Sequence, residues 1–304
     1  MHQGLQGRVS MRRRVFLGAA LTAPLAGCDV FPETPLPEAQ QPRFVAWPEP
    51  ARLALVLSSG GPRGFSHIGV LKALHEIGVK PDLVVGASVG ALLGSVMCAG
   101  ASMAEIERIG MEFDFKTLVR LSLTSGYKLS GSGLAHFVNQ QVQRHLGHTT
   151  LERFPIRFAA VAADVQTGEL AAFNRGDCGR AVQASAAIPG RFDPVAIRGR
   201  MYQDGDLVAP MPVRWTRSSG ARKVIAVDCS ARVDNPPPGA EVYRQADLKK
   251  RALTDAEAKL ADLTLHPDIG YWVHLSREYR ERTSKIAYEY TMARRKEIER
   301  LVAE

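Results

Sequence analysis

The chain has 304 residues, of which 45% are hydrophobic, and it carries 39 basic and 31 acidic side chains for a net charge of +8. This length and composition fit a globular protein with a substantial core and exclude a disordered or fibrous chain. No stripe of lysine and arginine with interleaved aromatic residues occurs, so nucleic-acid binding is not predicted. The four cysteines form no C-x-x-C pair, so a zinc site is not predicted either.

The N-terminal segment has the features of an export signal. Arg12–Arg14 precede a short apolar run from Val15 to Leu25, which ends in small residues. This run is too short to span a bilayer as a mature helix. Arg13–Leu17 resembles a twin-arginine export signal. Leu25–Cys28 resembles a lipoprotein cleavage box, in which Cys28 becomes the lipidated first residue; the alternative is a plain cleaved signal with an incidental cysteine.

Three parts of the chain follow from this interpretation: a signal peptide at 1–27, a proline-rich tether at 28–50 and a folded domain at 51–304. Cleavage removes four arginines and no acid, which leaves 35 basic against 31 acidic residues and a net charge of +4. That charge suits an anionic lipid surface only weakly. We therefore expect an exported lipoprotein, anchored to a membrane on the periplasmic face of a bacterial cell envelope.

The domain alternates apolar strands with helices. Strands are predicted at Leu53–Leu57, Leu83–Val85, Ile156–Ala163, Glu169–Phe173, Val195–Tyr202 and Lys223–Asp228, with the third and fourth forming a hairpin. Helices are predicted at His67–Ile77, Val89–Cys98, Met103–Phe113, Leu134–Leu146 and Ser276–Val302. This alternation predicts an α/β fold with a mostly parallel central sheet between layers of helices. Three cysteines are expected to be buried thiols, with one disulfide left open: Cys98, Cys178 and Cys229.

The first predicted loop of the domain is rich in glycine. It runs from Ser58 to Gly64 between a strand and a helix, and its consecutive glycines allow backbone N–H groups to converge on an anion. A dinucleotide-binding G-x-G-x-x-G pattern fails because Ser59 occupies the place of the first glycine, and no Gly-Lys-Ser/Thr completes a Walker loop. An oxyanion hole is the interpretation that remains, because serine hydrolases place such donors after an early strand.

Gly86-Ala87-Ser88-Val89-Gly90 follows the second predicted strand and precedes a helix. This is the context in which a G-x-S-x-G pattern forms a nucleophile elbow. The turn is so tight that its flanking positions tolerate almost no side chain, hence the two glycines. Ser88 would lie near the start of the helix, where free N–H groups and the helix dipole favour negative charge. In the alternative interpretation Ser88 only caps that helix.

Asp204 ends a predicted strand at a glycine turn. Loops at the carboxyl ends of parallel strands form the crevice of such sheets, so an active-site carboxylate would lie there. The alternative is an ordinary Asp-Gly turn. Asp206 stands two residues on, and its charge would raise the pKa of Asp204 if both side chains face the site; otherwise Asp206 points to solvent.

Together these segments resemble the patatin-like phospholipase family, in which Gly60–Gly64, Gly86–Gly90 and Asp204–Gly205 have counterparts in this order and spacing. Further segments resemble it too: Phe65–Leu74, Ala184–Gly190 and Pro210–Val213. The resemblance implies a Ser–Asp hydrolase fold that acts on lipid acyl esters. Two departures stand out, because Ser59 replaces the usual first glycine and Asp206 stands where the family usually has glycine or alanine.

Carried over to this sequence, the resemblance implies that Ser88 is the nucleophile, Asp204 its base, and Gly60, Gly61 and Arg63 the oxyanion hole. It implies membrane lipid as substrate and neither a metal nor an organic cofactor. The leading hypothesis is a membrane-tethered hydrolase of phospholipid or lysophospholipid acyl chains that works through an acyl-enzyme.

Two other hypotheses stay open at this point. One is a non-catalytic, membrane-tethered binding or scaffold protein on a hydrolase frame, which the unusual Asp206 favours. The other is a Ser–Asp–His triad, for which His266 is the candidate histidine. His67, in the first predicted helix, is expected to pack in the core or brace a loop.

Overall fold

The computed structural model describes residues 35–112, 120–121, 129–232 and 236–303, so the predicted signal peptide and the start of the predicted tether lie outside the described residues. The strands are β1 Leu53–Leu57, β2 Leu83–Ala87, β3 Arg120–Leu121, β4 Leu129–Ser130, β5 Arg157–Asp164, β6 Leu170–Phe173, β7 Val195–Ile197, β8 Arg200–Asp204, β9 Lys223–Val227 and β10 Leu263–Leu265. The helices are α1 Phe65–Ile77, α2 Val89–Cys98, α3 Met103–Glu112, α5 Ser132–Leu146, α6 Cys178–Ser185, α7 Val213–Ser218, α8 Arg244–Ala258, α9 Arg277–Ala293 and α10 Arg295–Ala303.

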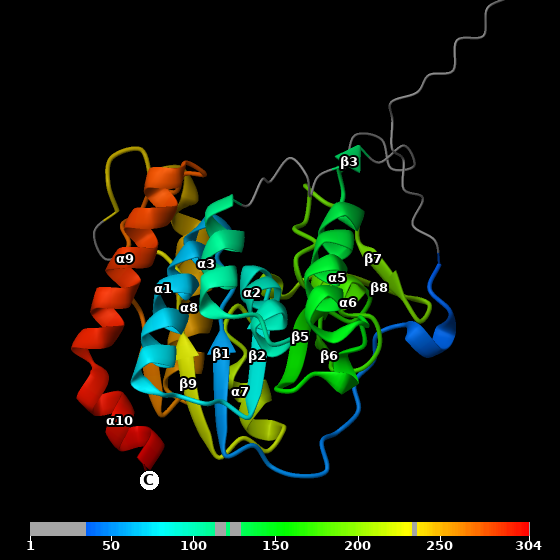
Figure 1. Cartoon of the computed structure of the whole chain (residues 1–304). Coiled ribbons are helices and arrows are strands. Elements are labelled where there is room, and N and C mark those ends of the chain that lie inside the picture. The colour runs from blue at the N-terminus through cyan, green and yellow to red at the C-terminus, as the bar shows by residue number, and fades with distance from the viewer. Residues whose placement is uncertain (1–34, 113–119, 122–128, 233–235, 304) are drawn as a thin grey trace, which may run out of the picture. The chain divides into compact units, whose positions relative to one another are not determined.

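A central sheet organises the domain (Figure 1). Its strand order is β10-β9-β1-β2-β5-β8-β7, and β6 pairs with β5. The strands from β10 to β5 run parallel to one another, whereas β6 and β8 each pair antiparallel with β5, and β7 pairs antiparallel with β8. The predicted α/β fold with a mostly parallel sheet is therefore confirmed.

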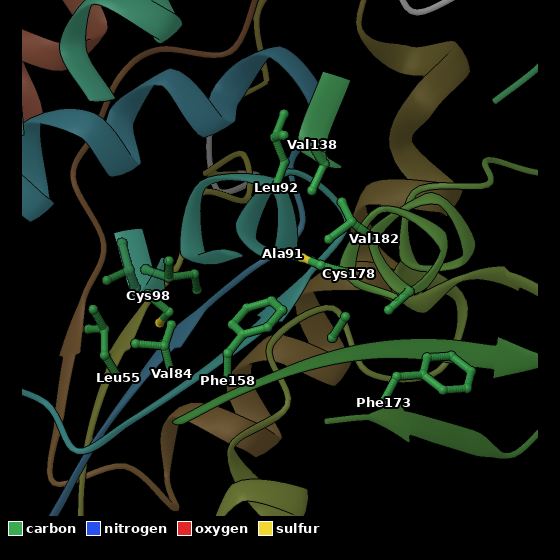
Figure 2. Close-up of a cluster of buried hydrophobic side chains, with 14 of the residues drawn as sticks. Leu55, Val84, Ala91, Leu92, Cys98, Val138, Phe158, Phe173, Cys178 and Val182 are labelled. Atoms are coloured by element: carbon green, nitrogen blue, oxygen red, sulfur yellow. The ribbon is translucent and has the colours of Figure 1, made fainter. Parts of the chain in front are cut away.

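Helices cover both faces of the sheet, as the fully buried pattern of β1 requires. Successive side chains of a strand point to opposite faces. Leu53, Leu55 and Leu57 pack with residues of α1, α2, α5 and α6, part of which Figure 2 shows. Ala54 and Val56 pack on the other face, where Val213 of α7 and Ala258 of α8 cover the sheet. On the first face, α9 lies against α1, with Ser284 close to Gly69.

Two predicted elements are interrupted in the structure. The single strand expected at 195–202 is a hairpin, because Arg198 and Gly199 adopt φ angles of 50° and 74° and turn the chain between β7 and β8. Two successive residues with positive φ match the twist of a two-residue hairpin. The long C-terminal helix expected at 276–302 breaks at Arg294, between α9 and α10.

Three helices were not expected from the sequence: α6, α7 and α8. α6 begins at an aspartate cap, since the side chain of Asp177 accepts the backbone N–H of Arg180. α8 is mostly polar, and Thr254 is its one buried residue. The predicted helices α1 and α2 bury long runs of apolar residues, which made them visible in the sequence.

The cysteines agree with the expectation of buried thiols. Cys98, Cys178 and Cys229 are all buried and free in the described structure. Burial raises the pKa of the Cys229 thiol to about 12, so it stays protonated at neutral pH. No helix in the described part of the chain combines the length and apolar character that a bilayer crossing requires.

Candidate active site

Ser88 occupies a strained turn between β2 and α2. Its φ and ψ angles are 53° and −119°, a backbone conformation that residues other than glycine rarely adopt. The flanking glycines are needed for space, because a Cβ at Gly90 would lie 2.2 Å from the carbonyl oxygen of Leu57 and one at Gly86 would lie 2.5 Å from the backbone nitrogen of Ala91. This is the geometry of a nucleophile elbow.

The sheet register brings Asp204 to the same place. On one side of β5, Ala87 of β2 pairs with Val161, and Asp204 of β8 pairs with the next residue, Ala162. β6 occupies the other side of β5. The end of β8 therefore meets the end of β2 head-on. The sequence prediction placed Asp204 at the end of a parallel strand; the strand is in fact antiparallel, and it reaches the site from the opposite direction.

The side chains of Ser88 and Asp204 meet. The Ser88 hydroxyl donates a hydrogen bond of 2.8 Å to Oδ2 of Asp204, and the backbone N–H of Asp206 donates one of 2.8 Å to Oδ1. Both members of the pair are buried, with exposed fractions of 6% and 2%. Burial raises the pKa of Asp204 to about 7, and the Asp206 charge adds to the rise. Hydrogen bonds from the Asp206 N–H and from Ser88, and the charge of Lys250, act in the opposite direction.

This raised pKa gives Asp204 a chemical capacity that an ordinary aspartate lacks. A carboxylate whose pKa lies near neutrality accepts a proton from a hydroxyl more readily, and it can return that proton later in a reaction. The pair thus has the geometry and the basicity to activate a serine without a histidine.

A segment that the sequence marked only by its family resemblance holds both residues in place. The hydroxyl of Ser185 accepts the backbone N–H of Ser88 at 2.9 Å and donates to the carbonyl of Val161 at 2.6 Å. The carbonyl of Ala187 accepts the backbone N–H of Asp204 at 3.0 Å. No role was predicted for this segment, although its likeness to the family was the signal that could have indicated one.

The glycine-rich loop lies beside Ser88. Gly61 has a φ of 53° and lines the same cavity as Ser88, directly after Gly60. Arg63 turns away: its backbone N–H donates to the carbonyl of Gly60 at 3.1 Å, and its guanidinium donates to the carbonyl of Tyr271. The assignment of Gly60, Gly61 and Arg63 to an oxyanion hole stays a prediction. The N–H of Val89 is a candidate donor that was not named from the sequence; Val89 follows the serine and begins a helix whose first N–H groups have no partner within it.

His67 braces the loop, as the sequence suggested. Its Nε2 lies 2.9 Å from the carbonyl oxygen of Ser58, the ring is fully buried, and burial lowers its pKa to about 4. The other candidate histidine, His266, lies elsewhere: its Nε2 is 3.0 Å from the carbonyl oxygen of Ser230, and its Nδ1 is 3.6 Å from Asp228. The Ser–Asp–His alternative is not supported, because Ser88 bonds directly to Asp204.

Asp206 neither faces Ser88 nor points freely into solvent. Its Oδ1 accepts a hydrogen bond from the hydroxyl of Ser59 and an ion-pair contact of 2.5 Å from Nζ of Lys250. The same Nζ lies 3.0 Å from the Ser59 oxygen. No sequence pattern indicated a role for Lys250, which lies on α8.

An apolar cavity opens at Ser88. Its lining includes Phe65, Leu92, Ile109, Leu134 and Phe192, and Ser88 lies in its wall. Such a cavity accommodates a hydrocarbon chain rather than a polar ligand. Among the described residues no group of three or more His, Cys, Asp and Glu side chains is arranged to hold a metal ion.

Comparisons with known proteins identify relatives of this chain. An uncharacterized NTE family protein of Mycobacterium tuberculosis is 33% identical over 207 residues, which cover 68% of this chain and 57% of that protein. Lysophospholipase NTE1 of Coccidioides immitis is 30% identical over 189 residues, or 62% of this chain and 12% of that protein. The chain therefore spans only part of the length of these relatives.

Among solved structures, VipD from Legionella pneumophila matches with a TM-score of 0.58 at 14% identity, covering 88% of this chain and 72% of VipD, which shows a shared fold. A model of the patatin-like phospholipase family matches residues 55–215, which contain the glycine-rich loop, the serine elbow and Asp204. The chain belongs to the patatin-like phospholipase family.

Proposed function

We propose that this protein is a serine hydrolase that cleaves acyl esters of phospholipids or lysophospholipids through the dyad of Ser88 and Asp204. One observation carries the proposal: the buried hydrogen bond of 2.8 Å between the two side chains, at the wall of an apolar cavity. Membership of the family supports the proposal, and so does the lysophospholipase named above, a relative of 30% identity.

The chemistry follows from the contacts. Oγ of Ser88 attacks the ester carbonyl while its proton passes to Oδ2 of Asp204. The N–H of Val89 and the glycine-rich loop face the developing oxyanion. Asp204 then returns the proton to the departing alcohol, which leaves an acyl-serine. Water gives a proton to Asp204, attacks the acyl-serine and releases the fatty acid, and the proton returns to Ser88.

The cavity supplies the preference for lipid. An acyl chain that leads away from Ser88 would lie against Leu92, Ile109, Leu134 and Phe192, whose burial by the chain is favourable at about 25 cal/mol per Å² of apolar surface. Phospholipid and lysophospholipid both present such a chain, so the cavity selects for the acyl group rather than for the head group.

A lipid anchor belongs to the same proposal. The basic head, the apolar run and Cys28 in a lipoprotein box support export and acylation at that cysteine, followed by retention at a membrane of the cell envelope. Mass spectrometry of the mature N-terminal peptide tests this directly: a diacylglyceryl-modified Cys28 supports the anchor, and an unmodified N-terminus after a different cleavage site refutes it.

A lipid panel tests the hydrolase itself. Wild-type protein and Ser88→Ala are incubated with phospholipids and lysophospholipids, and released fatty acids are identified by mass spectrometry. We expect release by wild type and by the control Ser218→Ala, which changes an exposed serine on α7, and none by Ser88→Ala. A fluorophosphonate probe tests the rival scaffold hypothesis, which requires that Ser88 remain unlabelled.

A further inference from the structure

A lysine from outside the family-matched region reaches the aspartate turn. Lys250 lies on α8, beyond residues 55–215, yet its Nζ is 2.5 Å from Oδ1 of Asp206 and 3.0 Å from Oγ of Ser59. We propose that Lys250 is a positioning residue of the dyad, whose ammonium group neutralises Asp206 and keeps Asp204 ready to accept the proton of Ser88. This inference rests on the proposed function, because it concerns how the charge of Lys250 controls the protonation of Asp204 in the same site.

The structure shows why neutralisation is needed. Asp206 is only two residues from Asp204, and its backbone N–H is bonded to Oδ1 of Asp204. A second carboxylate this close disfavours the charged form of Asp204 and raises its pKa, whereas the positive charge of Lys250 lowers it. Burial and the Asp206 charge both raise the pKa of Asp204, and without Lys250 only the hydrogen bonds from Ser88 and from the Asp206 N–H would oppose them, so a larger share of Asp204 would be protonated at neutral pH.

Asp206 and Lys250 are the charged side chains with the leading effects on the pKa of Asp204, beside its burial and its hydrogen bonds. Ser88 contributes its hydroxyl, and His67 behind the loop is neutral because burial lowers its pKa to about 4. The effect of Lys250 on the base can therefore be separated from other charges.

Lys250 also connects the two halves of the site. Its ammonium donates to the Ser59 hydroxyl, which in turn donates to Asp206. The first contact fixes the residue before Gly60 and Gly61, and the second fixes the turn after Asp204. One side chain thus spans the gap between the proposed oxyanion loop and the base.

The rest of α8 is held without Lys250, so its charge can be removed without releasing the helix. The hydroxyl of Tyr271 donates to Asp247 near the start of the helix. Near its end, Glu257 accepts the backbone N–H of Arg214 at 2.6 Å, and Thr254 is buried.

The test combines opposite changes of charge in the full chain. Lys250→Met keeps an unbranched side chain of similar length and removes its charge, Asp206→Ala removes the opposing charge, and the double variant removes both. Lys250→Arg retains the charge, and Lys249→Met is the matched control, because Lys249 is the exposed neighbour on the same helix. Two measurements are made: the pH dependence of kcat/KM on a soluble acyl ester, and the titration of ¹³C-labelled aspartate carboxyls, with Asp204 assigned by Asp204→Asn.

We expect Lys250→Met to move the acidic limb of the kcat/KM profile upward by about one pH unit, which is about a tenfold loss of activity below the limb. Asp206→Ala should move it downward, and the double variant and Lys250→Arg should return it close to wild type. The carboxyl resonance of Asp204 should shift its midpoint in the same directions.

Each outcome has a definite meaning. If Lys250→Met leaves both the limb and the Asp204 resonance where Lys249→Met leaves them, the role of Lys250 is refuted, while hydrolysis by wild type would keep the proposed function intact. If the resonance moves as expected but no variant, wild type included, hydrolyses an acyl ester, the charge coupling stands and the proposed function falls.

Discussion

Replacing Asp204 with asparagine should lower activity and raise stability at the same time. The asparagine has the same size, its oxygen can still accept the N–H of Asp206, and its amide can donate to the Ser88 oxygen. Activity falls because the amide accepts no proton, and loss of a general base costs about 10²–10⁴ in kcat/KM. Stability rises because a buried carboxylate that must ionise is replaced by a neutral group.

The size of the stability gain follows from the pKa of Asp204, which burial raises from 3.8 to about 7. Each tenfold change in proton affinity corresponds to 1.36 kcal/mol, so the difference amounts to as much as about 4 kcal/mol. A raised carboxyl pKa means that the folded state binds the proton more tightly than the unfolded chain. The wild type therefore loses stability as the pH rises from about 3.8 to about 7, and the loss is constant above that.

Urea unfolding of wild type and Asp204→Asn at pH 4, 6 and 8 measures this difference. The free energy of unfolding of the variant, minus that of wild type, should increase from pH 4 to pH 8. The kcat/KM of the variant on a soluble ester should be low at every pH. Asp255→Asn, an exposed aspartate on α8, is the control with neither effect. A stability difference that is the same at all three pH values would refute the burial argument, and retained activity would mean that another group is the base.

Two further predictions concern the elbow and the cavity. Gly90→Ala should be destabilised by about 1–3 kcal/mol or more in thermal unfolding, because the new Cβ falls 2.2 Å from the main-chain oxygen of Leu57; an unchanged Tm would contradict the close approach. Leu134→Trp should narrow the cavity and reduce hydrolysis of long-chain esters about tenfold more than that of short-chain esters, and an unchanged ratio would mean that the acyl chain binds elsewhere.

The sequence predicted the parts of the site that lie in local patterns. The elbow around Ser88 was visible because a turn this tight demands glycines at fixed positions, and the fold was visible because buried strands and helices carry strong apolar periodicity. The direction of β8 could not be predicted, because two short strands joined by an Arg-Gly turn look like one continuous strand in the sequence. Lys250 could not be predicted for another reason: its contact with Asp206 joins residues 44 apart in the sequence, and it lies on a mostly polar helix that was not predicted.

The position of β9 has a practical consequence for the design of truncated fragments of this protein. The family model ends at residue 215, before β9, but β9 pairs with β1 along its whole length and joins it to β10. A fragment that stops at residue 215 would retain Ser88 and Asp204, but it would lack β9. β1 would then become an exposed edge strand with unpaired backbone amides and uncovered aliphatic side chains. Such an edge recruits other chains, so the stretch recognised by homology is shorter than the stretch that folds as a unit.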